Sequence, residues 1–274
     1  MTNEVWWRLG FFLSILVIMM LIEWRMPARQ APIKSSKRWF ANFGLVFISS
    51  VIARLAVPVG LTAVALYNQQ HGNQQHGIGL FNIINLPSIV VVILSLILLD
   101  IIIYWQHRLF HRVPMLWRLH KVHHADAHVD ASTGLRFHPI EIILSILVKL
   151  VAVSLLGVPA IAVLIFEIAL NGLAIFNHAN IRLSPALEKP LRLILMTQIL
   201  HRIHHSQRVS ETNSNYGFSV IWWDWIFGSY KGKAKQSDNE LDIGLKEYPA
   251  AKQNASLWGL LTMPFSNNLV KKNK

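Results

Sequence analysis

Three observations predict an all-α, polytopic transmembrane protein. Hydrophobic residues make up 53% of the 274-residue chain and charged residues only 15%, whereas about a quarter of a typical soluble domain is charged. The mean hydropathy is positive. The apolar residues also occur in blocks, the longest of which can cross a hydrocarbon core of about 30 Å as helices. The five apolar blocks are residues 9–22, 40–67, 86–105, 140–156 and 160–176.

The first block has the flanking residues of a membrane anchor. Trp6, Trp7 and Trp24 border it, and tryptophan is enriched at both membrane interfaces. A signal peptide is the alternative, but Glu4 is out of place in a basic n-region and no small-residue cleavage site follows the block. We therefore expect the block to be retained as an anchor.

The last two blocks are short and closely spaced. Each would form about 25 Å of helix, which barely spans a bilayer, and Gly157-Val158-Pro159 separates them. A tight helical hairpin over residues 140–176 is expected, with a re-entrant pair as the alternative. Arg54, inside the second block, either faces a polar cavity or headgroup or marks a break of that span near Pro58.

The distribution of charge gives the blocks an orientation. A net charge of +12 suggests nucleic acid or an anionic membrane surface as a partner, and the apolar blocks favour the membrane. Five basic residues lie from Arg25 to Arg38, whereas Asn68–Asn85 contains no Lys or Arg. Because Lys and Arg concentrate in cytoplasmic loops, the first loop is placed in the cytoplasm. The third block and the hairpin then both end on that side.

Histidines gather at this cytoplasmic side. An HxxxH motif places His107 and His111 on one helical face, because residues four apart are neighbours on a helix. Two HxxHH motifs follow, and the adjacent pair in each diverges enough to serve two metal ions. With a lone histidine after the hairpin, the candidate ligands are His107, His111, His120, His123, His124, His178, His201, His204 and His205.

Nine imidazoles predict a site for two metal ions, because they exceed what one ion can hold. Nitrogen ligands suit zinc, iron, copper or nickel better than magnesium or calcium. The absence of cysteine excludes thiolate ligands and cysteine-bound iron–sulfur clusters. The alternative, solvated histidines that reach toward headgroups, does not account for three dense motifs on one side. His71 and His76 in the external loop, and His128 without a spaced partner, are expected to lie outside the site.

Further side chains are candidates to orient the ligands. Asp100 and Tyr104 continue the helical stripe of the HxxxH motif at steps of four and three. A metal-bound histidine commonly donates its other N–H to a carboxylate or carbonyl. Asp224, set among tryptophans, is a similar candidate, and His138 begins the hairpin on the side where it can line the site.

At these residues the chain resembles the fatty acid hydroxylase superfamily, also called the sterol desaturase family. The resemblance runs from about Asp100 to Tyr230. Besides the histidine motifs it includes Leu116-Trp117, Arg136-x-His138-Pro139, His178-Ala179-Asn180, Asn215-Tyr216-Gly217 and Trp223-Asp224-x2-Phe227-Gly228-Ser229-Tyr230. It implies a membrane-embedded non-haem di-iron oxygenase of the bacterial type, with the nine histidines as ligands and Asn180 among the residues around them.

The resemblance also implies a reaction and its needs. The family contains fatty acid and sphingolipid hydroxylases, sterol desaturases, sterol methyl oxidases and carotenoid hydroxylases, so hydroxylation or desaturation of a lipid with O₂ is expected. Two iron ions are the expected cofactors, with zinc possible in a purified sample. Fatty acid 2-hydroxylase members carry a second histidine four residues after the one matching His178. The chain has Arg182 there, which argues against that subgroup.

Electrons are expected to come from a separate protein. The chain has no cysteine and no glycine-rich dinucleotide loop, so a ferredoxin, cytochrome or reductase must supply them. Three arginines are candidates for contact with an anionic headgroup or with the donor: Arg136, Arg182 and Arg202.

The expected organisation is a polytopic transmembrane helical protein with a cytoplasmic histidine-rich helical cap that holds a di-metal site, in a bacterial inner membrane. Spans occupy residues 1–95, a catalytic domain 96–230, and a polar, loosely ordered cytoplasmic tail 231–274. A cap closed by structural zinc is an alternative, and saturated coordination would support it. A metal transporter is less favoured, because transport sites lie near the midplane of the membrane and these histidines lie at span ends.

Overall fold

The computed structural model describes residues 2–31, 35–72, 78–248 and 255–266. Over these residues the fold is all-α, as the sequence predicts. No strand is present in the described part of the chain, which contains only two isolated β-bridges, Leu195 with Val220 and Ser206 with Ile243.

Five helical segments of the described chain are long and apolar enough to cross a membrane. They coincide with the five predicted blocks, with boundaries that differ by a few residues. The long helices are α1 (Thr2–Arg25), α2 (Ser35–Ala56), α5 (Ser88–Arg112), α7 (Pro139–Leu156) and α8 (Ala160–His178).

The second predicted span is broken near Pro58, as one of the two interpretations of Arg54 predicts. Helix α2 ends at Ala56, and α3 (Leu61–Gly72) resumes after Pro58. Proline has no N–H to continue the helical ladder. The Arg54 guanidinium donates a hydrogen bond to the carbonyl of Pro58 at 3.1 Å, so this arginine satisfies a carbonyl that the break leaves free.

Glycine permits the tight turn between α7 and α8. Gly157 ends α7 with φ of 69°, a left-handed conformation that favours glycine. The turn packs on the segment before α4 (Leu80–Ile83). A Cβ added at Gly79 would lie 2.3 Å from the Gly157 nitrogen, so this contact of two backbones excludes any side chain there.

The interior and the outer surface of the long helices are both apolar. One core cluster joins α3, α5, α7 and α8 through residues such as Leu99, Ile103, Val163 and Phe166. Large hydrophobic side chains are exposed on the outside, including Trp6, Phe47 and Leu55. Contiguous exposed apolar surface on this scale is expected of a protein surrounded by lipid.

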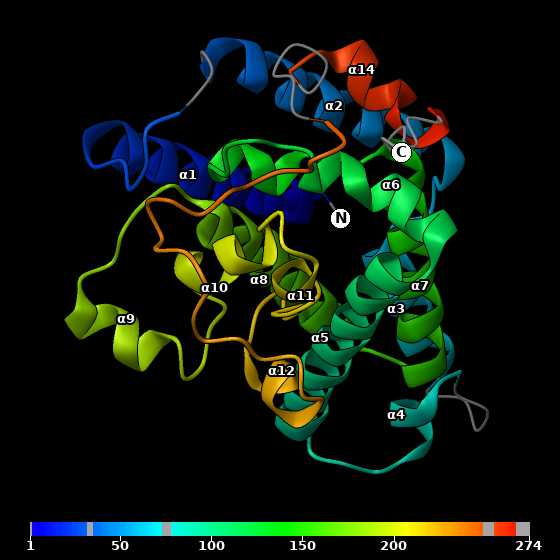
Figure 1. Cartoon of the computed structure of the whole chain (residues 1–274). Helices are drawn as coiled ribbons and strands as arrows, with labels where there is room; N and C mark the ends of the chain where they lie inside the picture. Colours follow the sequence, from blue (N-terminus) through cyan, green and yellow to red (C-terminus); the bar gives the residue numbers. More distant parts are fainter. Residues whose placement is uncertain (1, 32–34, 73–77, 249–254, 267–274) are drawn as a thin grey trace.

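Short helices are gathered at one end of the long ones. In Figure 1 the yellow and orange helices lie beside α5 and α8. The short elements are α6 (Pro114–His124), η1 (Ala131–Leu135), α9 (Pro185–Leu191), α10 (Gln198–His204), α11 (Val209–Thr212) and α12 (Trp222–Ile226). Together they form the histidine-rich part of the protein.

The tail is not loosely ordered over its described residues, contrary to expectation. Leu241 and Ile243 are buried against Val129. Helix α14 (Leu257–Thr262) and η2 (Met263–Phe265) pack on α2 and α6, where Leu260 and Met263 are buried. Apolar residues scattered in a polar segment therefore fix it to the cap. Residues 249–254 and 267–274 lie outside the described residues.

Candidate metal centre

All nine candidate ligands come together in two groups. Within each group, one ring nitrogen of every histidine lies within 4.8 Å of the others. The larger group is His107, His111, His120, His124 and His204; the smaller is His123, His178, His201 and His205. Each HxxHH motif contributes to both groups, because the two adjacent histidines at its end point in different directions.

The larger group presents its Nε2 atoms inward. The Nε2 atoms of His107, His120, His124 and His204, and both ring nitrogens of His111, are buried and have no hydrogen-bond partner. Buried polar atoms without partners are rare in folded proteins. The opposite nitrogens of three rings are held from behind, which fixes the ring orientation as in metal-bound histidines. The Nδ1 atoms of His107, His120 and His204 lie 2.8, 2.7 and 2.7 Å from the Tyr216 carbonyl, the Glu141 carboxylate and the Ser214 carbonyl.

The smaller group is contracted around His178. Its Nδ1 donates to the Ala174 carbonyl at 2.6 Å, so Nε2 of the neutral ring carries a lone pair. That atom lies 2.8 Å from Nε2 of His201, 3.0 Å from Nε2 of His123 and 3.3 Å from Nε2 of His205. Metal–nitrogen bonds of about 2.1 Å bring nitrogens to about 3.0–3.4 Å from one another. The spacing therefore fits a shared ion.

The candidate ligands outside the membrane spans are held neutral. Burial, reinforced by neighbouring imidazoles, lowers the pKa of His123, His124, His201 and His205 well below the ordinary value. Burial lowers the pKa of His204 to about 3. Neutral imidazole is the form that binds metal, so these side chains are ready to coordinate at neutral pH.

The loop after α11 supplies two of the carbonyl acceptors, and Asp224 shapes it. Asp224 accepts hydrogen bonds from the backbone N–H groups of Tyr216 and Gly217 at 2.8 and 2.7 Å. This turns the Tyr216 carbonyl toward His107. Asn215 adopts a positive φ of 52°, and a Cβ on Gly217 would lie 2.4 Å from the Val220 carbonyl oxygen. The Asn215-Tyr216-Gly217 motif and Asp224 thus act on the site through one backbone carbonyl.

Glu141 is a contact that the sequence reasoning missed. It is buried in the first turn of α7, and its carboxylate lies 2.7 Å from Nδ1 of His120. The signal was present, because an ionisable residue inside an apolar segment is usually functional. The same rule led to Asp100, but not to a glutamate on the hairpin.

Asp100 and Tyr104 form hydrogen bonds with other side chains of the described chain and not with the candidate ligands. Asp100 accepts from the Trp223 indole N–H at 2.7 Å. The Tyr104 hydroxyl pairs with Ser229 and receives a hydrogen bond from Arg108, both at 2.8 Å. These contacts tie α5 to the segment around α12, which carries Asp224.

Other histidines are placed away from the two groups. His138 caps α7, where its Nδ1 accepts from the Ile140 N–H and its Nε2 lies 3.2 Å from the Leu261 carbonyl. His128 is buried and accepts from Asn180. His71 is exposed and pairs with the Tyr67 carbonyl, while His76 lies outside the described residues.

The three candidate arginines bind carboxylates or carbonyls of the chain itself. Arg136 is fully buried and donates to the Val122 carbonyl at 2.8 Å. Arg202 is fully buried and pairs with Asp238 at 2.7 Å. Arg182 is half-exposed and also pairs with Asp238, at 3.4 Å. Only Arg182 therefore retains an accessible guanidinium for an external anion.

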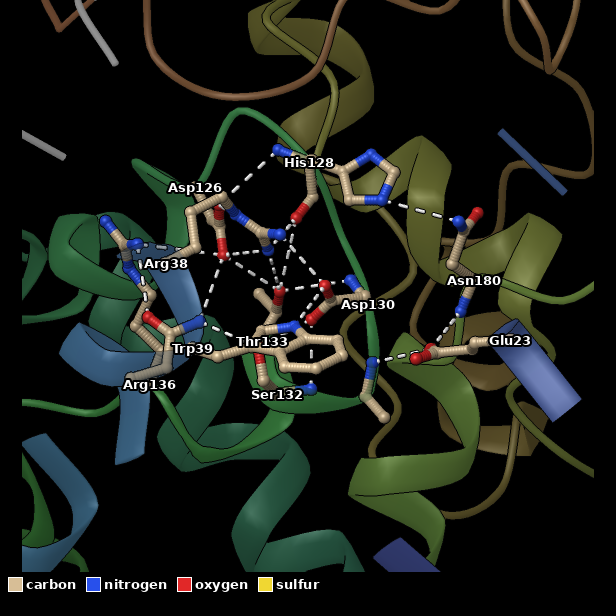
Figure 2. A network of polar contacts seen from close by, with 12 residues as sticks. Glu23, Arg38, Trp39, Asp126, His128, Asp130, Ser132, Thr133, Arg136 and Asn180 are labelled. Carbon is tan, nitrogen blue, oxygen red and sulfur yellow. Dashed lines mark hydrogen bonds and ion pairs between the residues drawn. The ribbon is translucent and has the colours of Figure 1, made fainter. Parts of the chain in front are cut away.

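A buried polar network fastens α1 and α2 to the loops that follow α6 and α8, which are part of the histidine-rich part of the protein (Figure 2). Arg38 donates to Asp126 and to Asp130 at 2.7 and 2.9 Å. Glu23 of α1 accepts from the backbone N–H groups of Ala131 and Asn180. Burial opposes the ionisation of Asp126, but the charges of Arg38 and Arg136 outweigh it and lower its pKa. The network is anchored two residues after His124 and two residues after His178.

An apolar cavity of about 170 Å³ extends from the larger group between the long helices. His107, His120 and Glu141 line its inner end, and Phe12 and Lys149 are among the residues that line the rest. An apolar cavity of about 150 Å³ can hold a ligand the size of benzene. The candidate ligands are thus open toward a hydrophobic space inside the membrane region.

The segment that carries these side chains matches a known protein family. The family model described as fatty acid hydroxylase matches residues 92–229, half of the chain. The chain belongs to the fatty acid hydroxylase family. The matched segment of this family member contains all nine histidines, Glu141 and Asp224.

Named relatives of this fatty acid hydroxylase family member act on different lipids. An ornithine lipid hydroxylase of Rhizobium tropici is 31% identical over 57% of this chain and 46% of its own length. Human alkylglycerol monooxygenase is 30% identical over 47% of this chain and 28% of its own. A Δ(7)-sterol-C5(6)-desaturase of Nicotiana tabacum is 26% identical over 57% and 55%. The chain thus spans about half or less of these relatives, and no solved structure matches it.

Proposed function

We propose that the protein is a membrane-bound non-haem di-iron oxygenase that hydroxylates, or desaturates, a lipid with O₂ and externally supplied electrons. The observation that carries this proposal is the cavity between the long helices, which meets His107 and His120 at its inner end. The alkyl chain of a lipid would occupy this apolar space. Hydroxylation is the first reaction to test, because two of the relatives are named hydroxylase and monooxygenase.

The nine histidines would hold two iron ions, which would supply the activation of O₂ that attack on an unreactive C–H bond needs. The chain's own residues do the rest. Glu141 and the carbonyls of Tyr216 and Ser214 orient three rings, and the apolar cavity positions the chain of the substrate. A transporter or a closed structural zinc site has no use for an apolar cavity that opens onto its ligands.

Electrons would arrive from the opposite side of the larger group. A second cavity, of about 540 Å³ and lined by more polar residues, reaches His111 and Trp117 and is bordered by Arg208 and Lys246. Glu247 also borders this cavity, so the rim carries two basic residues and one acidic residue. A ferredoxin, cytochrome or reductase with an acidic surface would be attracted to the small net positive charge. The chain has no cysteine with which to carry electrons itself.

We place the site on the cytoplasmic side, in a bacterial inner membrane. The C-terminal ends of α1, α5 and α8 and the N-terminal ends of α2 and α7 all contribute contacts to the histidine segments. The five spans therefore alternate in direction with one end in common. The loop that joins α1 to α2 at this end is basic, which favours the cytoplasm.

The test combines metal analysis with turnover. Purified full-length protein is expected to bind two iron ions and, with ferredoxin, ferredoxin reductase and NADPH, to add one oxygen atom to a component of a bacterial lipid extract, including ornithine lipid. Loss of two hydrogens instead would indicate desaturation. NADPH and O₂ alone should give no product. Two firmly bound zinc ions with no product after exchange for iron would contradict the proposal and favour a structural site.

A further inference from the structure

Three charged side chains meet beside the apolar cavity, and one of them, Lys149, lines it. They come from three different helices: Arg8 from α1, Lys149 from α7 and Glu167 from α8. Arg8 pairs with Glu167 at 2.6 Å, and the Lys149 ammonium lies 3.8 Å from the other Glu167 oxygen. The side chains of Lys149 and Glu167 are only 13% and 14% exposed. Charges at this depth of a membrane protein are costly and usually functional.

The cluster has a net charge of +1, because it contains two basic side chains and one carboxylate. Two cations face one carboxylate, and Arg8 holds that carboxylate at hydrogen-bond distance while Lys149 does not. The Nε atom of Arg8 is buried and has no hydrogen-bond partner. Lys149 is thus the cation that is held less closely by the Glu167 carboxylate, and it lines the apolar cavity. A third cavity, of about 70 Å³, lies beside Arg8 and Glu167 and shares Phe12 and Asn171 with the apolar cavity.

Helix α7 gives Lys149 a fixed separation from Glu141, the carboxylate that contacts His120. Glu141, which holds His120, and Lys149 line the same cavity from the same face of α7, with Ser145 between them. Eight residues of helix separate them, which is about 12 Å along the axis. The cavity therefore has a metal-facing end and a cationic end, joined by apolar walls.

We propose that Lys149, with Arg8, binds the anionic group of the substrate, and that its distance from the histidines selects the carbon that is oxidised. This rests on the proposed function for the chemistry at the histidines but not for the binding. The ligand is an alkyl or acyl chain that bears one negative charge. A carboxylate of a free fatty acid and a phosphate of a lipid share that chemistry.

A purely structural ion cluster makes a different prediction. In that case Lys149 serves only to neutralise Glu167, and removal of the Glu167 charge would weaken the assembly. If Lys149 instead binds an external anion, Glu167 competes with that anion. The wild-type protein should then already prefer an anion to an uncharged chain, which a cluster in which Lys149 only neutralises Glu167 would not produce, and Glu167→Gln should strengthen that preference.

Binding is measured on the purified full-length protein in a neutral detergent, by calorimetry, without turnover. The probes are dodecanoate, dodecyl phosphate and uncharged dodecanol, which have the same chain. We expect at least one anion to bind more tightly than dodecanol. Lys149→Met should lower the affinity for that anion about 10- to 100-fold, the loss typical of a hydrogen bond to a charged group. The affinity for dodecanol should not change. The stronger of the two anions identifies a carboxylate or a phosphate as the source.

Matched variants separate binding from folding. Lys189→Met removes an exposed lysine and should change no affinity, Lys149→Arg should restore most of the anion preference, and Glu167→Gln should strengthen it. Equal affinity of dodecanol and both anions for the wild-type protein would overturn the proposal. So would a Glu167→Gln variant with unchanged or weaker anion binding, even if Lys149→Met fails to fold. Anion binding without any oxidised product would leave this proposal standing and contradict the proposed function instead.

Discussion

Arg38→Met is expected to destabilise the histidine-rich part of the protein, so that on heating it unfolds at a lower temperature than the membrane helices. The guanidinium of Arg38 is 0% exposed, and it pairs with Asp126, which is 1% exposed, and with Asp130, which is 6% exposed. Methionine has a similar length and keeps the packing of the stem. The substitution therefore leaves two buried carboxylates with a single remaining cation nearby, Arg136, at 3.6 Å from Asp126.

The magnitude follows from burial. Removal of one partner of a buried ion pair typically costs about 3–5 kcal/mol, because the other charge stays buried without compensation. Such a loss is a large fraction of the 5–15 kcal/mol by which most domains are stable. At about 2–4 °C per kcal/mol for a chain of this size, the unfolding midpoint should fall by about 6–20 °C. Metal should also be lost, because Asp126 follows His124 by two residues.

The assay is thermal unfolding in detergent at a fixed scan rate, together with metal analysis. Arg182→Met is the matched control, because its pair with Asp238 is 49% and 21% exposed and such pairs contribute about 0–1 kcal/mol. The triple variant Arg38→Met, Asp126→Asn, Asp130→Asn should recover part of the loss, since no uncompensated charge remains. Equal midpoints for Arg38→Met and Arg182→Met would refute the reasoning.

Four further predictions concern the site and its supports. His204→Ala should lose activity and most of the metal of the larger group, whereas His71→Ala, at an exposed histidine, should change neither; unchanged metal content in His204→Ala would contradict the ligand assignment. Glu141→Gln should keep both metals and lower turnover about 10- to 100-fold, with Glu240→Gln on the surface as its control; a rate equal to that of the control would exclude the role at His120. Gly217→Ala should cost about 1–3 kcal/mol and displace the Tyr216 carbonyl, because its Cβ would lie 2.4 Å from the Val220 oxygen, whereas Gly10→Ala, with nothing within 4 Å, should be neutral in the same unfolding assay. Burial lowers the pKa of His128 from its ordinary 6.5 to about 4, so its contribution to the free energy of unfolding is complete above pH 6.5, and about 3 kcal/mol of that free energy is lost as pH falls toward 4. His128→Gln should therefore make the free energy of unfolding depend less on pH between 6.5 and 4. The same pH dependence in the wild-type protein and the variant would show that His128 is not buried in its neutral form.

The sequence alone predicts the helices and the candidate ligands for clear physical reasons. A bilayer has one requirement, apolar length, and that requirement is local in sequence, so all five spans are visible as blocks. Metal ligation by helices is also local. The four-residue repeat of His107 and His111, and the two HxxHH motifs, already fix which imidazoles share a face.

Contacts between distant segments cannot be read in this way. Glu141 reaches His120 across 21 residues, and the Tyr216 carbonyl reaches His107 across 109. A carbonyl acceptor has no side-chain signature at all, so its position depends on the turn that Asp224 and Gly217 shape. The tail is a similar case, because Leu241 and Ile243 are buried only once the cap exists to receive them.

What the sequence determined by itself is therefore the class of the protein, its spans and the histidines that gather at one side. The tertiary structure decided how those histidines divide into two groups, which atoms hold each ring from behind, and that Arg136 and Arg202 are buried in pairs within the chain. It also decided that Lys149 faces the cavity that starts at His107. The physical reason is that helical periodicity and hydrophobic length are properties of neighbouring residues, whereas hydrogen bonds, burial and cavities depend on residues that only folding brings together.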